Sequence, residues 1–199
     1  DREPRLELFR KNGVEVLYLY DMADEFVLES LGDYKEKKLV SADNVNPDDL
    51  NEIENAADSS DEDEDGDTES PADISAVIGR FKGVLGDRVI DVRVSERLVK
   101  SPACIVGSDE VSGHMEKMIR MMNKSSDFPK RVMELNAKHS LIKSLATIIA
   151  KDPTSDFVDR ACEQLFEGCM LLDGYLNDPH TFIERVNQVL DEAASQRST

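Results

Sequence analysis

The amino-acid sequence predicts an α+β fold made of three parts. In the first part, helical patterns alternate with a continuous apolar run typical of a strand covered on both faces. In the second part, short strand patterns predict a small three-stranded sheet with helices. In the third part, two helical patterns separated by a turn signal predict a terminal helical hairpin.

Residues 1–45 are predicted to be a truncated α/β layer. A helix over residues 4–12 is expected to end at Gly13, because glycine suits the left-handed position after a helix. The run Val14–Tyr20 predicts a buried strand, and Asp21 marks the start of a second helix. One or two strands cannot form a stable sheet and the chain lacks an initiator methionine, so we expect it to be an excised piece of a longer protein.

The acidity of the chain is concentrated around residues 46–73, which are predicted to be a flexible linker or insertion. The formal net charge is −18, yet the stretch between Lys38 and Arg80 holds fourteen acidic residues and no basic one. Such a stretch stays solvated and repels itself. The rest of the chain is near charge balance and has no basic stripe with interleaved aromatic residues, so nucleic acid is not an expected partner.

The acidic stretch also contains the opening of a calcium-binding EF-hand loop. Asp61, Asp63, Asp65 and Gly66 occupy the required spacing. Counting from Asp61, however, position 12 is Ala72, where the loop needs a glutamate that binds calcium through both oxygens. The sequence therefore predicts no metal site here.

Residues 74–199 are predicted to form the second and third parts. A first helix is expected to close at Gly86, and Asn136 is expected to cap a later helix over residues 141–149. Strands are predicted over residues 90–94, 103–106 and 131–135. In the first of these strands, alternation places Ile90, Val92 and Val94 on one face.

The terminal hairpin is predicted to consist of helices over residues 157–172 and from Pro179 to about residue 194. Asp173-Gly174 ends the first helix and Asp178 caps the second. Both helices carry apolar faces, composed of Phe157, Val158, Cys162, Leu165, Cys169 and Leu172 in the first and Phe182, Val186, Val189 and Leu190 in the second. Two helices packed only on each other would leave part of these apolar faces in contact with water. Either the preceding α+β unit or a second copy of the hairpin could cover it.

A further amphipathic helix, rich in methionine, is predicted between the second and third strands. Its apolar stripe recurs at helical spacing and consists of Val111, Met115, Met118, Ile119 and Met122. Methionine side chains adapt to many shapes, so such a face suits contacts with varied partners. From the pattern alone, an ordinary face packed against the core is the alternative.

The chain resembles the C-terminal part of the ninety-kilodalton heat-shock protein family of ATP-driven chaperones. The resemblance is carried by several spaced motifs in the family's order: Gly13–Leu17, Asp21–Phe26, Leu85–Val89, then Val92, Ser95, Arg97, Leu98, Ser101 and Pro102, then Glu134–Lys143, and last Asp178-Pro179. The cytosolic eukaryotic branch ends in a Met-Glu-Glu-Val-Asp tail, whereas this chain stops at Ala-Ser-Gln-Arg-Ser-Thr199. The resemblance is therefore to the bacterial high-temperature protein G-like type, and tail-docking co-chaperones are not expected.

The resemblance implies a division of the chain and a role for each part. Residues 1–45 would end the middle domain, and residues 74–199 would form the C-terminal dimerisation domain. The two closing helices of each subunit would build a dimeric four-helix bundle, and the methionine-rich helix would contact non-native client proteins. ATP and Mg²⁺ would bind the full-length parent outside these residues, so this chain would hold no cofactor and would not itself be an enzyme.

The remaining residue patterns exclude several function classes. No spacing suggests a Ser-His-acid or Cys-His catalytic arrangement or a phosphate-binding glycine loop, and no apolar run is long enough to span a membrane. The three cysteines are an odd number, and Cys162 and Cys169 are too far apart on one helix to pair. A reducing compartment is therefore indicated, and we expect a cytoplasmic protein. A purely structural dimerisation module, with the methionine-rich helix buried and clients bound elsewhere in the parent, is the alternative function.

Overall fold

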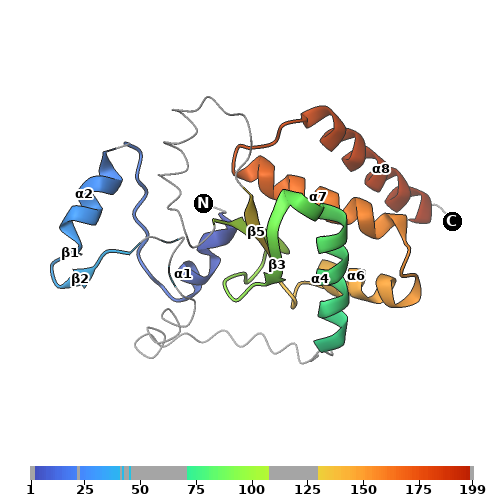
Figure 1. The fold of residues 1–199 in the computed structure, drawn as a ribbon, viewed down its shortest axis with the longest axis horizontal. Helices are drawn as coiled ribbons and strands as arrows, with labels where there is room; N and C mark the ends of the chain where they lie inside the picture. Colours follow the sequence, from blue (N-terminus) through green and yellow to red (C-terminus); the bar gives the residue numbers. More distant parts are fainter. Residues whose placement is uncertain are drawn as a thin grey trace.

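The computed structural model describes residues 3–21, 23–40, 42, 45, 71–107 and 130–197. At the N-terminus, the 3-10 helix η1 (Pro4–Leu6) continues into the short helix α1 (Glu7–Lys11), and Gly13 follows with a φ of 64°. The helix α2 (Asp24–Leu31) and a two-stranded hairpin, β1 (Asp33–Tyr34) and β2 (Lys37–Lys38), come next. Figure 1 shows α2 and this hairpin set apart from the C-terminal elements. The expected helices and the glycine stop are confirmed.

The strand predicted over Val14–Tyr20 is wrong. These residues belong to no helix or strand, and the side chains of Leu17, Tyr18, Leu19 and Tyr20 are between 45% and 93% exposed. A strand is stable only when its backbone groups bond to a neighbouring strand, and none of the described segments pairs with this one. The run is apolar, but no described segment covers it as a neighbouring strand.

The second part is a three-stranded mixed sheet. After the helix α4 (Pro71–Leu85) and the 3-10 turn η2 (Gly86–Arg88), the strands are β3 (Val89–Val94), β4 (Ala103–Val106) and β5 (Arg131–Leu135). Their order is β3-β5-β4, with β5 parallel to β3 and antiparallel to β4. The three predicted strands are therefore confirmed, and β5 is the central one.

The side chains that β3 buries differ from those that the predicted alternation places on one face. Val89 and Val92 are buried, whereas Ile90 is 53% and Val94 39% exposed. The pairing register with β5 shifts between Val89 and Asp91. Such a bulge adds one residue to one strand, so the side chains on either side of it no longer follow a single two-residue period.

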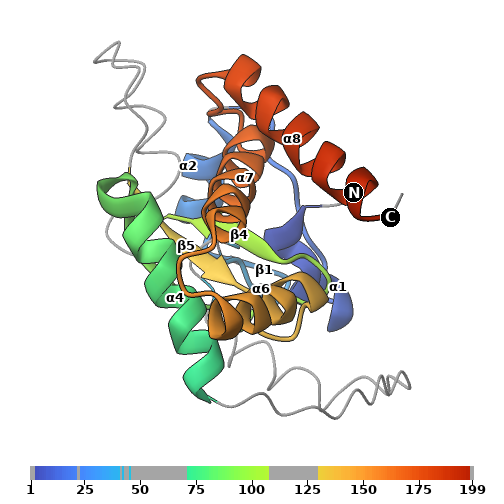
Figure 2. The same ribbon diagram turned by 90° about the vertical axis from the view of Figure 1, so that its right-hand side faces the viewer.

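One hydrophobic core lies between the sheet and three helices. The core takes side chains from α4, from α6 (Ser140–Lys151), from α7 (Asp156–Leu172) and from one face of all three strands. Its fully buried members include Val77, Phe81, Leu85, Val92, Ile105, Met133, Leu135, Ile142, Leu145, Val158 and Cys162. Figure 2 shows these three helices gathered around the sheet.

The cap of α6 is not the predicted residue. The His139 Nδ1 atom accepts a hydrogen bond from the Leu141 amide at 3.1 Å, so His139 is the capping residue. The Asn136 Oδ1 atom instead accepts one from the Lys138 amide, and the Asn136 side chain donates to the Ser101 carbonyl at 3.1 Å. Asn136 therefore joins two loops rather than starting the helix.

The terminal hairpin is confirmed. Gly174, with a φ of 75°, ends α7, and the Asp178 carboxylate accepts hydrogen bonds from the amides of His180 and Thr181 at the start of α8 (Pro179–Arg197). Figures 1 and 2 both show α8 lying along α7 at the outside of the molecule. Of the predicted linker, residues 46–70 lie outside the described residues, and Pro71 begins α4.

Candidate functional surfaces

The predicted client-contact stripe falls in the segment between β4 and β5. Its residues, Val111, Met115, Met118, Ile119 and Met122, all lie outside the described residues. The strands that flank the segment are described: β4 ends at Val106 and β5 begins at Arg131. The client-contact assignment therefore stays a prediction.

The apolar residues predicted to form the dimer interface divide into two groups. Val158, Cys162 and Cys169 are at most 6% exposed, because α4 and the sheet of the same chain cover them. Phe157 and Leu165 are half-buried against the same core. The three buried side chains are enclosed by their own subunit, and the assignment of the whole set to an interface between subunits stays a prediction.

The other group remains on the surface of the hairpin. Leu172 is 64% and Leu190 61% exposed, while Phe182, Val186 and Val189 are half-buried. Two further residues of the hairpin that were not among the predicted interface residues are also exposed, Leu171 at 50% and Ile183 at 52%. Their apolar character was visible in the sequence, but Leu171 lies off the apolar line of α7. We call Leu171, Leu172, Ile183 and Leu190 the hairpin patch.

The three cysteine thiols are unsuited to nucleophilic chemistry. All three are buried and unpaired by disulfides. Burial raises the pKa of the Cys162 thiol to about 12 and that of Cys169 to about 12, and it also raises the pKa of Cys104, which has the Glu134 carboxylate nearby. Because the thiolate is the reactive form, these side chains act as small apolar core residues.

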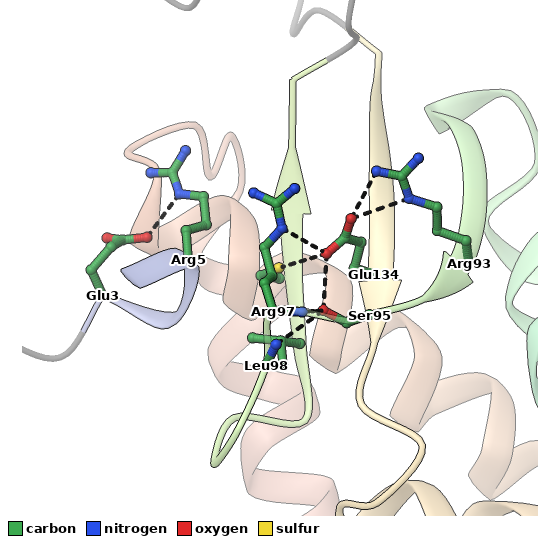
Figure 3. Close-up of polar contacts among 8 residues, drawn as sticks. Glu3, Arg5, Arg93, Ser95, Arg97, Leu98 and Glu134 are labelled. Atoms are coloured by element: carbon green, nitrogen blue, oxygen red, sulfur yellow. Dashed lines mark hydrogen bonds and ion pairs between the residues drawn. The ribbon is translucent and has the colours of Figure 1, made fainter. Parts of the chain in front are cut away.

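A buried carboxylate organises the loop between β3 and β4. Glu134, in the central strand β5, is 3% exposed. Its Oε1 atom accepts hydrogen bonds from Arg93 at 2.8 and 3.1 Å, and its Oε2 atom accepts one from the Ser95 hydroxyl at 2.9 Å. The Arg97 guanidinium, also buried, forms an ion pair with the same Oε2 atom at 3.2 Å. Figure 3 shows these side chains converging on Glu134.

The network gives a physical meaning to the loop motif seen in the sequence. The Ser95 hydroxyl oxygen also accepts hydrogen bonds from the amides of Arg97 and Leu98, which closes the turn after β3. A buried carboxylate is tolerated only when paired and hydrogen-bonded, and both conditions are met here. The arrangement holds the loop in place, and we find in it no nucleophile or acid–base pair.

The far end of the same loop binds a second carboxylate. The Glu7 side chain, from α1, accepts hydrogen bonds from the amides of Val99 and Lys100 at 2.7 Å each, and from the Ser101 amide and hydroxyl, the latter at 2.6 Å. Partial burial acts to raise the pKa of Glu7, but the hydrogen bonds from Ser101, Lys100 and Val99 outweigh it and hold the pKa below its ordinary value. Glu7 thus ties the N-terminal elements to the C-terminal unit.

Comparison with known proteins identifies the family. The family described as "Hsp90 protein" matches residues 1–199, the whole chain. The chain belongs to the Hsp90 family. It is 41% identical over 191 residues to the chaperone protein HtpG of Oleidesulfovibrio alaskensis, and 39% identical over 194 residues to that of Chlorobaculum tepidum. Each alignment covers 96% of this chain, but only 30% and 29% of the respective relatives.

This Hsp90-family chain therefore corresponds to about 30% of the length of its HtpG relatives. Another relative, the chaperone protein HtpG of Nitratidesulfovibrio vulgaris, is 34% identical over 197 residues, which cover 96% of this chain and 30% of the relative. Among the described residues, no group of three or more His, Cys, Asp or Glu side chains is placed to hold a metal ion. Within the same ranges, no helix has the length and apolar character needed to cross a membrane.

Proposed function

We propose that this chain is the dimerisation and client-contact region of an ATP-dependent molecular chaperone that binds unfolded proteins and assists their folding. Membership of the Hsp90 family and the similarity to HtpG chaperones support the general role. The hairpin patch carries the specific one, because it leaves four large apolar side chains, each at least half exposed, on two adjacent helices. An apolar surface of this kind on a folded chain indicates a protein partner.

A second copy of the chain is the partner that best fits the hairpin patch. An isologous contact places the same surface from both subunits together, so two hairpins would form a four-helix bundle. Withdrawing a large apolar side chain from water contributes about 1.5–3 kcal/mol. Each residue of the patch would contribute twice, which favours a stable dimer.

Dimerisation would serve the parent chaperone by tethering two arms at one end. The tether raises the effective concentration of the distant ATP-binding domains for each other, so that closure of the pair is intramolecular. ATP and Mg²⁺ belong to those domains of the parent, and this chain would be no enzyme on its own. The stripe Val111–Met122 would supply weak, adaptable contacts to non-native proteins, and two copies would add avidity.

Two measurements on the purified chain test the proposal. Sedimentation should give the mass of a dimer at micromolar concentration, and a monomer would refute the dimerisation role. Binding of a permanently unfolded, fluorescently labelled protein should weaken when Met115 and Met118 are both replaced by serine, while the melting temperature stays unchanged. Lys124→Ser, in the same segment but off the stripe, is the matched control and should bind normally.

The alternative is a purely structural dimerisation module whose methionine-rich segment is buried. Methionine oxidation follows exposure, so mild peroxide distinguishes the two functions. Rapid oxidation of Met115 and Met118 in the folded dimer supports client contact. Protection of both residues, together with a loss of stability in the serine variants, supports the structural module.

A further inference from the structure

The N-terminal segment, residues 3–14, is joined to the C-terminal unit by polar contacts. Its apolar side chains cluster with one another and with nearby residues of the same region: Leu6, Leu8 and Phe9 with Val14, Val16, Ala42 and Val45. The core between the sheet and the helices is a separate cluster that shares no residue with this one. The 3-10 helix η1 packs against β4, and hydrogen bonds and ion pairs add directional contacts between the segment and the unit.

Two nearby side chains of the segment make these contacts. Glu7 reaches the loop between β3 and β4, as described above. Arg5 reaches a different loop, where its Nη2 atom lies 3.3 Å from the Oδ1 atom of Asp173. The Arg5 Nε atom also donates a hydrogen bond to Glu3 at 2.9 Å (Figure 3). The segment thus contributes one anion and one cation to two different loops.

Asp173 follows the last residue of α7, at the turn of the terminal hairpin. Its side chain is 7% exposed, and its second oxygen, Oδ2, lies 3.5 Å from Nη1 of Arg131, whose side chain is also 7% exposed. The Arg131 guanidinium lies over the ring of Tyr175, 5.5 Å from its centroid. One buried carboxylate therefore contacts guanidinium groups from the N-terminal segment and from the central strand.

We propose that Asp173 locks the hairpin to the N-terminal segment, as the shared counter-ion of Arg5 and Arg131. With the carboxylate in place, two buried or half-buried cations are held close together around the hairpin turn. Without it, the two guanidinium groups lose the carboxylate that they share, and the positive charge of both is less well neutralised in a site with little water. Asp173 is a positioning residue: it acts on the segment through Arg5.

The lock also has a consequence for the proposed dimer, and this consequence rests on the proposed function. If two hairpins form the bundle, each N-terminal segment is held at a fixed angle to that bundle through Arg5 and Asp173. The direction in which each arm leaves the dimer is then set at the turn of the hairpin. The lock itself operates within one chain and does not require a dimer.

Hydrogen exchange of single amides tests the lock. The segment is reported by the amides of Asn12 and Val14, which donate to the carbonyls of Leu8 and Phe9, and the hairpin turn by the amide of Tyr175, which donates to Met170. A helix as short as α1 is unstable alone, so its amides exchange whenever the segment leaves the joint. Asp173→Asn should accelerate exchange at both places by about tenfold or more.

The other variants separate a lock from a local structural role. Arg5→Gln should accelerate exchange in the segment only, and Asp173→Glu should restore slow exchange in both places. Asp156→Asn, which removes an exposed carboxylate at the opposite end of α7 from Asp173, should change neither. Acceleration at Tyr175 alone in Asp173→Asn, or slow segment exchange in Arg5→Gln, would overturn the proposal.

The test stays informative if a variant unfolds or if the chain proves to be monomeric. Arg5→Gln changes a side chain that is 23% exposed and tests the segment even if Asp173→Asn does not fold. Exchange is measured within each chain, whereas sedimentation reports on dimerisation. A monomer with coupled exchange refutes the proposed function and keeps the lock, and a dimer with uncoupled exchange does the reverse.

Discussion

Replacing Leu190 by glutamine should weaken the proposed dimer without unfolding the chain. Leu190 lies on α8 and is 61% exposed. Full burial of a leucine contributes about 1.5–3 kcal/mol, so covering the exposed part contributes about 1–2 kcal/mol. The residue occurs twice in a symmetric interface, and the dissociation free energy should fall by about 2–4 kcal/mol. The dissociation constant should then rise about 30- to 1000-fold.

Sedimentation velocity over a dilution series measures this change directly. Glutamine is a good helix former, so α8 should persist, and the free energy of unfolding of the monomer should change by less than about 0.5 kcal/mol. Val27→Gln is the matched control, because Val27 is also 61% exposed but lies on α2, away from the hairpin. A dissociation constant unchanged by Leu190→Gln, or weakened equally by Val27→Gln, would refute the interface.

Three further outcomes are expected. Glu7→Gln should lower the free energy of unfolding by about 1–2 kcal/mol at pH 7. Because the pKa of Glu7 is depressed in the folded chain, its stabilisation is present above pH 4.5 and is lost as pH falls through the folded-state pKa, so urea titrations of wild type and variant should converge once pH lies below that pKa. Glu134→Ala should cost about 3–5 kcal/mol in the same titration, because it leaves the buried Arg97 unpaired; a loss below about 1 kcal/mol would contradict the network. Finally, Cys104, Cys162 and Cys169 should resist a thiol reagent at pH 7 until denaturant is added, and fast labelling of the folded chain would contradict their burial.

Local signals in the sequence placed most of the C-terminal elements. The strands at 103–106 and 131–135 and the hairpin stop at Gly174 follow from short-range composition and backbone preference, which do not depend on distant residues. The prediction that Asn136 caps α6 is wrong because Asn136 and His139 both have a side chain able to accept a hydrogen bond. The contact of Asn136 with the Ser101 carbonyl, 35 residues away, draws its side chain to another loop.

The prediction of buried faces was less successful. The apolar pattern of α7 gave two possible covers, and for Val158, Cys162 and Cys169 the cover is the chain's own core. The run Val14–Tyr20 has the composition of a buried strand, yet no described segment pairs with it. A pattern records that a side chain is apolar, but it does not record which surface will meet it.

The sequence by itself determined the family, the α+β class and the positions of most helices and strands, because spaced motifs and local propensities are written in neighbouring residues. Only the tertiary structure decided which apolar residues of the hairpin stay exposed, and which carboxylates join distant parts of the chain. Glu7 meets residues more than 90 positions away, and Asp173 meets Arg5 across most of the sequence. Such pairings depend on the path of the folded backbone, which brings these groups within bonding distance.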